Sequence, residues 1–340
     1  MIFFKNDYGS GAHPKVLEAL VSTNMENTVG YGMDEYTAQA ADAIRAKVGC
    51  PDVAVYLTMA GTQTNLTVIG ATLRPHEAVI SAETGHVCVH EAGAIEATGH
   101  KVIHVPTEDG KLRPADIDKV MKQHCNAHWV RPKMIYISNL TETGLTYNKA
   151  ELKALREKCD EHGLYVFMDG ARLAMALTQK DNDLKFTDLP ELCDVFYIGG
   201  TKCGVLFGEA IVIVNDSMKP DFNRIMKQKG AVLAKGRLLG VQFKAMFDGD
   251  LYLELGQHCN DLAQQLISAI AGNGYEFMWP PCSNMIFPIF PLSVVKKLDE
   301  AGVLYDDFEE VGDGKAAMRL CTSWSTTQEE VDEFIKLIEK

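Results

Sequence analysis

The central part of the chain alternates between two hydrophobic patterns. Short runs rich in β-branched and aromatic residues predict strands, and apolar residues at helical spacing lie between most of them. The predicted strands are 53–58, 78–82, 101–105, 134–138, 165–168, 195–198 and 210–214. The predicted helices include 62–73, 86–98, 114–124 and 149–162, with Gly99 and Gly163 at expected helix ends. Repeated strand–helix–strand units predict an α/β fold with a doubly wound sheet.

One connection in this sheet predicts a reversal of strand direction. Only residues 199–209, rich in glycine, separate the strands 195–198 and 210–214. A parallel return needs a crossover of about a dozen residues or more, usually a helix. We therefore expect a mostly parallel, seven-stranded sheet with one antiparallel strand.

A second alternation follows a helical stretch that runs from about residue 216 to about 247. It predicts a helix at 252–270, a strand near 285–290, a helix at 292–301, a strand at 317–321 and a helix at 327–340. We predict two domains: a large domain over 1–247, which includes the N-terminal segment, and a smaller α+β domain over 248–340.

The composition excludes several classes of function. The 340 residues carry 33 Lys+Arg against 46 Asp+Glu, a net charge of −13, which disfavours nucleic acid and anionic membranes as main partners. The nine cysteines are scattered without a C-x-x-C pair, as in free thiols of a reducing compartment. The N-terminal apolar run is too short for a signal peptide, and no apolar stretch reaches 18 residues. We expect a cytoplasmic protein with no transmembrane span.

Polar residues directly after two of the strands are candidates for chemistry. Gly61-Thr62-Gln63-Thr64-Asn65 opens a helix, where backbone N–H groups can bind an anion, although Thr62 as a plain helix cap explains it too. Asp169 follows the strand 165–168. A buried carboxylate needs a partner, either a cationic ligand atom or an ion pair with Arg172.

Lys202 lies in the glycine-rich turn 199–204. A partly desolvated lysine there has a lowered pKa and can form Schiff bases, whereas an exposed hairpin lysine is equally common. Taken together, a phosphate site, an aspartate and a lysine on successive strands are what pyridoxal phosphate (PLP) requires.

The sequence resembles the threonine aldolase and β-eliminating lyase family, which has PLP fold type I, the aspartate aminotransferase-like fold. The resemblance runs nearly end to end. It is carried by Gly30-Tyr31-Gly32 with Asp34, Gly61 to Asn65, His86 with Glu91-Ala92-Gly93, Asp169-Gly-Ala-Arg172, Thr201-Lys202, Lys235-Gly236-Arg237 and Met318-Arg319-Leu320.

The resemblance implies roles for the matching residues. Lys202 would form the Schiff base, Asp169 would keep the pyridine nitrogen protonated, and His86 would stack on the ring. Gly61, Thr62 and Arg237 would bind the phosphate, with Thr201 beside them. The substrate carboxylate would be bound by Arg172, Arg319 and Asn6, with Arg172 also near the phenolic oxygen, and Tyr31 would approach from a neighbouring subunit.

Two departures from the family pattern concern the substrate. Asn6-Asp7 stands where the well-known aldolases carry Ser-Asp, and Asn6 can still donate to a carboxylate. Glu142 stands where they carry a histidine thought to contact the substrate hydroxyl. A carboxylate with a raised pKa can take that proton as a general base, or can bind a cationic or hydroxylated side chain.

The resemblance implies a PLP-dependent lyase that cleaves the Cα–Cβ bond of a β-hydroxy-α-amino acid, such as threonine or allo-threonine, into glycine and an aldehyde. β-Elimination or aminotransfer on another amino acid is the alternative, and a PLP-free binding protein on the same fold is a rival from another class. The family implies a homodimer or homotetramer with sites at the dimer interface. We expect no metal site, because His86 and His90 lack a third ligand.

Overall fold

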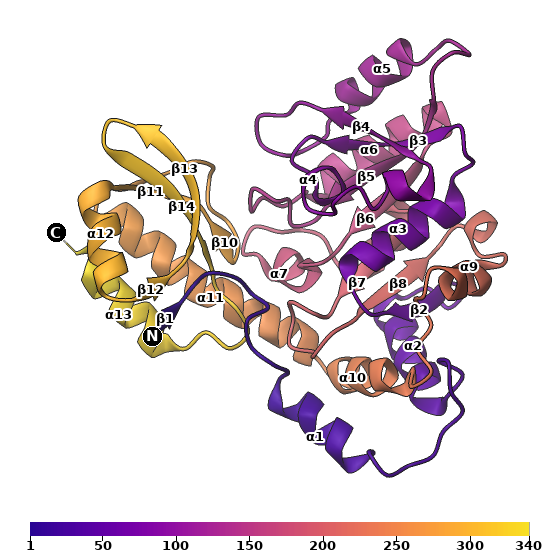
Figure 1. Ribbon diagram of the computed structural model, residues 1–340, viewed down its shortest axis with the longest axis horizontal. Coiled ribbons are helices and arrows are strands. Elements are labelled where there is room, and N and C mark those ends of the chain that lie inside the picture. Colours follow the sequence, from indigo (N-terminus) through magenta and orange to yellow (C-terminus); the bar gives the residue numbers. More distant parts are fainter. Residues whose placement is uncertain (340) are drawn as a thin grey trace.

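A seven-stranded mixed sheet forms the centre of the larger lobe (Figure 1). The computed structural model describes residues 1–339. The strand order is β2-β8-β7-β6-β5-β3-β4, and β8 is antiparallel to both of its neighbours. The strands are β2 (Ala54–Thr58), β3 (Glu77–Ala82), β4 (Lys101–Val105), β5 (Arg131–Ser138), β6 (Tyr165–Asp169), β7 (Val195–Gly199) and β8 (Glu209–Ile213). The predicted α/β class and the single reversed strand are confirmed.

Both faces of this sheet are covered, which explains why its strands are nearly continuous apolar runs. Alternate residues of one strand enter different cores: Ile135 and Ile137 pack on one face, and Met134 and Tyr136 on the other. The helices of this lobe are α1 (Pro14–Ser22), α2 (Glu35–Val48), α3 (Gly61–Thr72), α4 (His86–Val89), α5 (Pro114–Gln123), α6 (Lys149–His162), α7 (Leu173–Thr178), α8 (Leu189–Leu192), α9 (Phe222–Gln228) and α10 (Arg237–Phe247), with short 3-10 turns at Glu96–Thr98, Phe186–Asp188 and Asp216–Met218.

The predicted helix at 86–98 is wrong beyond its first turn. Helix α4 ends at Val89, and Ala92 and Gly93 have φ angles of 50° and 74°. A right-handed helix cannot contain such residues, so the chain turns there instead. Gly163 ends α6 in the left-handed conformation, as predicted.

The smaller lobe is built on the long helix α11 (Leu251–Gly272), which packs against both α7 and α13 (Figure 1). Its main sheet has the order β10-β14-β11-β9, with β13 beside β14. Its further elements are β9 (Glu276–Phe277), β10 (Met285–Ile286), β11 (Pro288–Pro291), α12 (Leu292–Glu300), β12 (Val303–Leu304), β13 (Asp306–Gly312), β14 (Lys315–Cys321) and α13 (Gln328–Ile338). Lys340, the end of the predicted last helix and small domain, lies outside the described residues.

The N-terminal strand β1 (Ile2–Phe3) pairs in parallel with β12 of the smaller lobe. Ile2 and Phe4 are buried in the same core as Leu298 and Phe334. These first residues therefore lie with the C-terminal lobe, although they were assigned to the large domain from the sequence. The predicted boundary at 247/248 falls between α10 and α11 and stays a prediction.

Candidate active site

The candidate residues gather at the carboxyl ends of the sheet strands, the edge where open α/β sheets bind ligands. Asp169 ends β6, and Ser138 ends β5. Helices α3 and α4 begin at Gly61 and His86, which follow β2 and β3. Lys202 lies in the turn between β7 and β8.

Asp169 is a buried carboxylate whose partners among the described residues are all uncharged. Its Oδ1 accepts hydrogen bonds from the Ala171 N–H at 2.9 Å and the Tyr197 hydroxyl at 2.5 Å. Its Oδ2 accepts from the Tyr136 hydroxyl and from Asn65 Nδ2 at 3.3 Å. The considered ion pair with Arg172 is not formed, so the negative charge of Asp169 remains available to a cationic ligand atom.

Arg172 instead forms a buried ion pair with Asp7. Its Nε lies 2.6 Å from Asp7 Oδ2, and its Nη2 lies 3.1 Å from Oδ1. Burial alone would raise the pKa of Asp7, but the charges of Arg172 and Lys202 and the hydrogen bonds from Arg172 and Asn284 outweigh it, so this pKa is lowered. Nη1 of Arg172 has no hydrogen bond to the residues the structure describes and is left for a ligand.

Lys202 is partly buried and has no ion-pair partner within 4 Å in residues 1–339. Burial and then the positive charge of Arg172 lower the pKa of its amine, against the opposite effect of Asp7 and other carboxylates. A lysine with a lowered pKa has a larger fraction of neutral amine, the form that attacks a carbonyl.

Glu142 lies at the start of the loop after β5 and contacts both the end of that strand and the start of α4. Its Oε1 accepts hydrogen bonds from the Ser138 hydroxyl at 2.7 Å and from the His86 backbone N–H at 2.9 Å. Burial, followed by the charge of Asp169, raises the pKa of Glu142 against the hydrogen bond from Ser138. The structure therefore brings Glu142 and His86 together.

The N-terminus of α3 offers backbone donors to an anion. Its capping residue, Ala60, provides no side-chain hydrogen bond to the first turn, which begins with Gly61 and Thr62. A Cβ at Gly61 would lie 3.3 Å from the Tyr197 hydroxyl, so glycine leaves room over this turn. The Thr201 hydroxyl accepts from the Gly208 N–H at 3.0 Å and shapes the turn that carries Lys202.

Tyr31 contacts α9, and Arg237 contacts the segment between α1 and α2. Tyr31 is 55% exposed, and Lys227 Nζ lies 4.4 Å from its ring centroid. Arg237 donates to the Glu26 carbonyl at 2.9 Å, while its Nε and Nη2 are buried without a hydrogen-bond partner among the described residues. No hydrogen bond joins either residue to Lys202 or Asp169 within the described chain.

Arg319 and Asn6 also have partners within the chain. Arg319 is ion-paired with Asp306, and Asn6 Oδ1 accepts from the Tyr8 N–H at 3.1 Å. Desolvation and then the charges of His86, Arg319, Lys202 and Arg172 lower the pKa of His90, which places these groups within electrostatic reach of one another.

Most of the chain, residues 4–323, matches the model of the β-eliminating lyase family. The chain belongs to this family.

Individual relatives agree with this assignment. Low specificity L-threonine aldolase from Pseudomonas aeruginosa is 32% identical over 98% of this chain and 96% of its own length. A solved structure of Leishmania major threonine aldolase is 45% identical, with a TM-score of 0.98 over 99% of this chain and 98% of that chain. Thermus thermophilus aspartate aminotransferase with maleate, 16% identical, has a TM-score of 0.72 over 99% of this chain and 90% of that one, which shows the fold alone.

The family, the lyase class and PLP fold type I were predicted from the sequence and are confirmed. Lyases of this family use PLP, and the residues present fit that cofactor. Asp169 has a charge without a cationic hydrogen-bond partner, the first turn of α3 has uncapped donors, and Lys202 has no ion pair in the described chain. These three features match a pyridinium nitrogen, a phosphate and an aldehyde.

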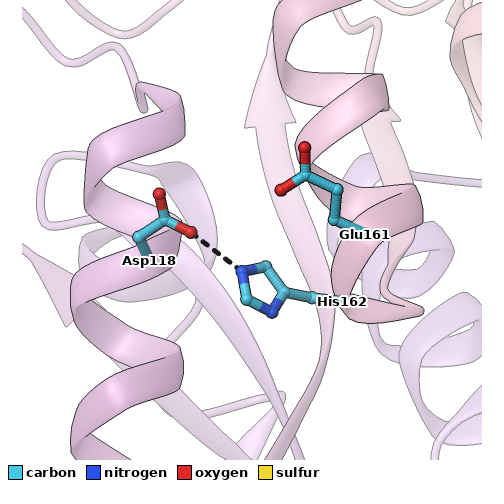
Figure 2. A group of neighbouring side chains, drawn as sticks. All are labelled: Asp118, Glu161 and His162. Carbon is cyan, nitrogen blue, oxygen red and sulfur yellow. Dashed lines mark hydrogen bonds and ion pairs between the residues drawn. The ribbon is translucent and has the colours of Figure 1, made fainter.

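A second group of ligand-type residues lies away from this site of the lyase. Asp118, Glu161 and His162 converge at the surface, where His162 Nε2 lies 2.9 Å from Asp118 Oδ1 (Figure 2). Lys158 already neutralises both carboxylates, at 3.2 Å from Asp118 and 2.6 Å from Glu161. An ion-paired surface cluster explains this arrangement without a metal ion.

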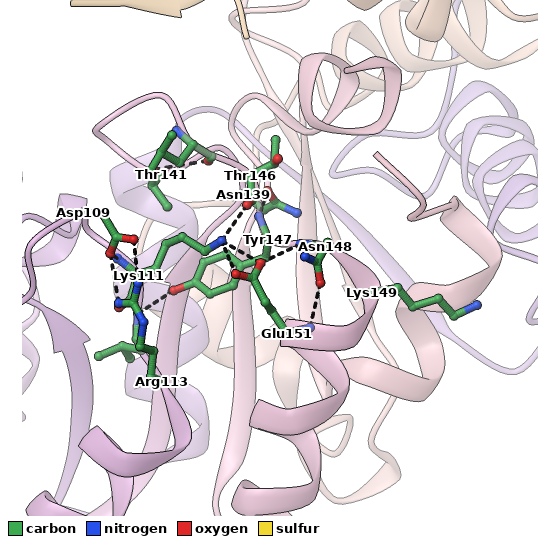
Figure 3. A network of polar contacts seen from close by, with 12 residues as sticks. Asp109, Lys111, Arg113, Asn139, Thr141, Thr146, Tyr147, Asn148, Lys149 and Glu151 are labelled. Carbon is green, nitrogen blue, oxygen red and sulfur yellow. Dashed lines mark hydrogen bonds and ion pairs between the residues drawn. The ribbon is translucent and has the colours of Figure 1, made fainter. Parts of the chain in front are cut away.

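A polar network connects residues 109–113 with the chain from Asn139 to Glu151, the stretch that includes position 142 in the sequence (Figure 3). Lys111 donates to the Thr146 carbonyl at 2.9 Å and to both oxygens of Glu151 at 2.5 and 2.6 Å. The Tyr147 hydroxyl accepts from the Leu112 N–H at 2.7 Å. The same stretch meets the smaller lobe, because the Gly144 carbonyl accepts from the Ser283 hydroxyl at 2.7 Å.

Several residues of the lyase site had no assigned role in the sequence analysis: Asp7, Asn65, Glu91, Tyr136, Ser138, Tyr197, Glu209 and Asn284. Tyr136 and Tyr197 pack on the same face of the sheet, and Asn65 Nδ2 lies 3.4 Å from the Tyr136 hydroxyl. Asp7 and Glu91 stand in motifs that were recognised. What they contact depends on which loops meet, and local sequence patterns do not show this.

Proposed function

We propose that this protein is a PLP-dependent aldolase that cleaves the Cα–Cβ bond of a β-hydroxy-α-amino acid, with L-threonine or L-allo-threonine as substrate and glycine and acetaldehyde as products. Curated relatives that are 32–33% identical over nearly the full chain carry the name low specificity L-threonine aldolase. The solved structure that is 45% identical is also a threonine aldolase.

The observation that carries this proposal is the position of Glu142 beside His86. Bond cleavage of this kind needs a base for the β-hydroxyl proton, and a carboxylate with a raised pKa is suited to that task near neutral pH. Glu142 is fixed by the Ser138 hydroxyl and the His86 backbone N–H, and burial raises its pKa. Glu142 would therefore act as the base at the position where the well-known aldolases carry a histidine.

The other residues bind and orient. Lys202 would supply the amine that binds PLP, and Asp169 would face the pyridine nitrogen and stabilise its protonated form. PLP, when bound, supplies the electron sink that accepts the electron pair of the broken Cα–Cβ bond. Arg172 Nη1 and Arg319 would bind the substrate carboxylate, with Asn6 as a neutral donor, because a guanidinium matches a carboxylate geometrically.

We include in the proposal that a second copy of the chain completes the site. The segment between α1 and α2 exposes large apolar side chains, the mark of an interaction surface. They are Met25 at 88%, Val29 at 66%, Tyr31 at 55% and Met33 at 73% exposure, and Val21 in the last turn of α1 adds to them at 75%. The orphaned nitrogens of Arg237 lie beside this segment and suit a phosphate. The assembly would be a homodimer or a dimer of dimers.

A cytoplasmic location is part of the same proposal. All nine cysteines are free, which suits a reducing compartment. Among residues 1–339, no helix is both long enough and apolar enough to span a membrane.

Product analysis tests the proposed reaction. The PLP-loaded protein is incubated with L-threonine, L-allo-threonine, L-phenylserine, L-serine and L-cysteine. Glycine together with the matching aldehyde is the expected result from the first three. Pyruvate and ammonia would show β-elimination instead, and conversion of PLP to its amine form, reversed by a keto acid, would show aminotransfer; either as the main outcome contradicts the proposal.

A further inference from the structure

The imidazole of His86 is held by a carboxylate that has no assigned part in the reaction. His86 Nδ1 lies 2.7 Å from Oε1 of Glu91, whose side chain is fully buried. The His86 side chain itself remains 32% exposed. Ala92 and Gly93, with positive φ angles, turn the chain directly after Glu91, so that this carboxylate faces back to the start of α4. One edge of the ring is thus fixed from inside the protein, the His90 ring lies 5.4 Å away between ring centroids, and part of the His86 ring remains exposed.

The same oxygen of Glu91 also connects His86 to Asp169. Asn65, in the second turn of α3, donates from Nδ2 to Glu91 Oε1 at 2.6 Å and to Asp169 Oδ2 at 3.3 Å. His86, Glu91, Asn65 and Asp169 therefore form one continuous hydrogen-bonded chain. It joins the residue expected over the cofactor ring to the residue expected at the ring nitrogen, and all of its inner members are buried.

The direction of the hydrogen bonds follows from this geometry. Oε1 of Glu91 accepts the Asn65 N–H, while Oε2 has no partner among the described residues. Because Glu91 Oε1 already accepts a hydrogen bond from Asn65, we infer that it also accepts the hydrogen bond from the His86 Nδ1–H. A neutral imidazole carries one proton, so Nε2 is then the unprotonated nitrogen, able to accept a proton or a hydrogen bond.

Burial raises the pKa of Glu91, and the hydrogen bonds from His86 and Asn65 act against this. Both donors thus stabilise the ionised carboxylate. A neutral glutamine at this position would keep the shape but would offer an amide that can donate or accept. The imidazole of His86 would then no longer be favoured in the tautomer that carries its proton on Nδ1.

We propose that Glu91 is a positioning residue that fixes His86 as its Nδ1–H tautomer, with Nε2 directed to the substrate side, and that Asn65 ties this orientation to Asp169. The proposal rests on the proposed function, because His86 and Asp169 face the cofactor only in that case. A purely structural Glu91 would hold the turn at 92–93 without any effect on the tautomer.

The test compares Glu91→Gln and Glu91→Ala with Glu96→Gln, a control that removes the same charge from an exposed glutamate in the next turn. The first readout is the 15N spectrum of histidine-labelled full-length protein without added PLP, with His86 assigned from a His86→Gln sample. The wild type and Glu96→Gln should show only the Nδ1–H form of neutral His86. Both Glu91 variants should lose this form or mix it with the Nε2–H form.

The second readout is kinetic. Glu91→Gln should lower kcat for L-threonine cleavage by about 10- to 100-fold, the loss seen when a carboxylate that orients a metal-ligating histidine is changed. KM and PLP content should stay at wild-type values. An unchanged tautomer in Glu91→Gln, or a lost tautomer with wild-type kcat, overturns the proposal. If Glu91→Ala does not fold, the isosteric glutamine variant decides.

The proposed function and this inference fail separately. A wild-type protein that cleaves no β-hydroxy amino acid contradicts the proposed function. The tautomer comparison between wild type, Glu91→Gln and Glu96→Gln needs no turnover and still decides whether Glu91 fixes His86.

Discussion

Asp7 and Arg172 form a buried, two-pronged ion pair, although 165 positions separate them in the chain. Asn284 of the smaller lobe also donates to Asp7 Oδ2, at 3.1 Å. The N-terminal segment, the large sheet and the smaller lobe therefore meet at one carboxylate. Arg172 is held by Nε and Nη2, and only Nη1 remains for a substrate.

The first prediction concerns Asp7→Asn. This change leaves the buried Arg172 charge without its partner and should lower the free energy of unfolding by about 3–5 kcal/mol. Because the pKa of Asp7 is lowered on folding, its contribution is fully present above the unfolded pKa and is lost as pH falls through the folded pKa. Urea denaturation at pH 7 measures the loss. Asp216→Asn, at a side chain that is 92% exposed, is the control and should be near wild type; equal losses in both variants would contradict the assignment.

The second prediction is that Lys202→Ala abolishes both activity and tight PLP retention. In the proposed reaction Lys202 supplies the only covalent link between the protein and the cofactor. Its amine has no ion-pair partner in the described chain. After dialysis the variant should lack the visible absorbance of the wild type. Lys180→Ala, at an exposed lysine, should keep it. Retained turnover in Lys202→Ala would remove Lys202 from the mechanism.

The third prediction tests Glu142 as the general base of the proposed reaction. Glu142→Gln should lower kcat by about 10²- to 10⁴-fold, the range for loss of a general base, with little change in PLP content. The wild-type rate should fall as pH drops through the raised pKa of Glu142, because its protonated form cannot accept a proton. Glu142→His should recover part of the rate and move that acid limb toward the ordinary histidine pKa of about 6.5. A wild-type acid limb that persists unchanged in Glu142→Gln would exclude Glu142 as the base.

These site residues differ in how far the sequence reveals them. Asp169 and Lys202 follow apolar strands, so the strand pattern places them at the binding edge of the sheet, whereas Glu142 is found only through the family resemblance. The partners of Arg172 and His86 are not visible in this way, because Asp7 reaches the site only when β1 pairs with β12. The strand pattern predicts where each chain segment ends, and packing decides which segments meet.

The error at 86–98 has the same origin. Apolar residues continue at helical spacing through this stretch, yet the backbone reverses at Ala92 and Gly93. That reversal buries Glu91 against His86 and Asn65. A local pattern cannot indicate this exchange of helical hydrogen bonds for a buried polar network, whereas the uninterrupted helix 149–162 was predicted with its correct bounds.

The fourth prediction tests the shared site. Met25→Asp combined with Val29→Asp places two charges on the exposed apolar segment between α1 and α2. The protein should shift to a monomer in sedimentation velocity, because an interface core does not tolerate unpaired charge. Its affinity for PLP should also fall, because in a monomer Arg237 would no longer lie beside the site of a partner copy. Leu292→Asp, on exposed α12, should leave the assembly unchanged. An intact oligomer in the double variant would place the interface elsewhere.

The last prediction concerns Glu209, whose side chain is buried beside the turn that carries Lys202. Its Oε2 accepts from the Gly200 N–H at 3.0 Å, and burial raises its pKa to about 8, against the hydrogen bonds from Thr201 and Gly200. The folded state therefore binds this proton more tightly than the unfolded state. The contribution of Glu209 to stability is present at low pH and is lost as pH rises from the unfolded pKa toward 8.

Glu209→Gln cannot lose a proton and should flatten this dependence. Between pH 5 and 8 the wild-type free energy of unfolding should fall relative to that of the variant, by at most about 1.4 kcal/mol per pH unit for one proton. Urea denaturation of both proteins at matched PLP content and several pH values gives the difference directly. A constant difference across this range would show that Glu209 titrates at the same pH in the folded and unfolded states, and its partners at Gly200 and Thr201 would then be structural only.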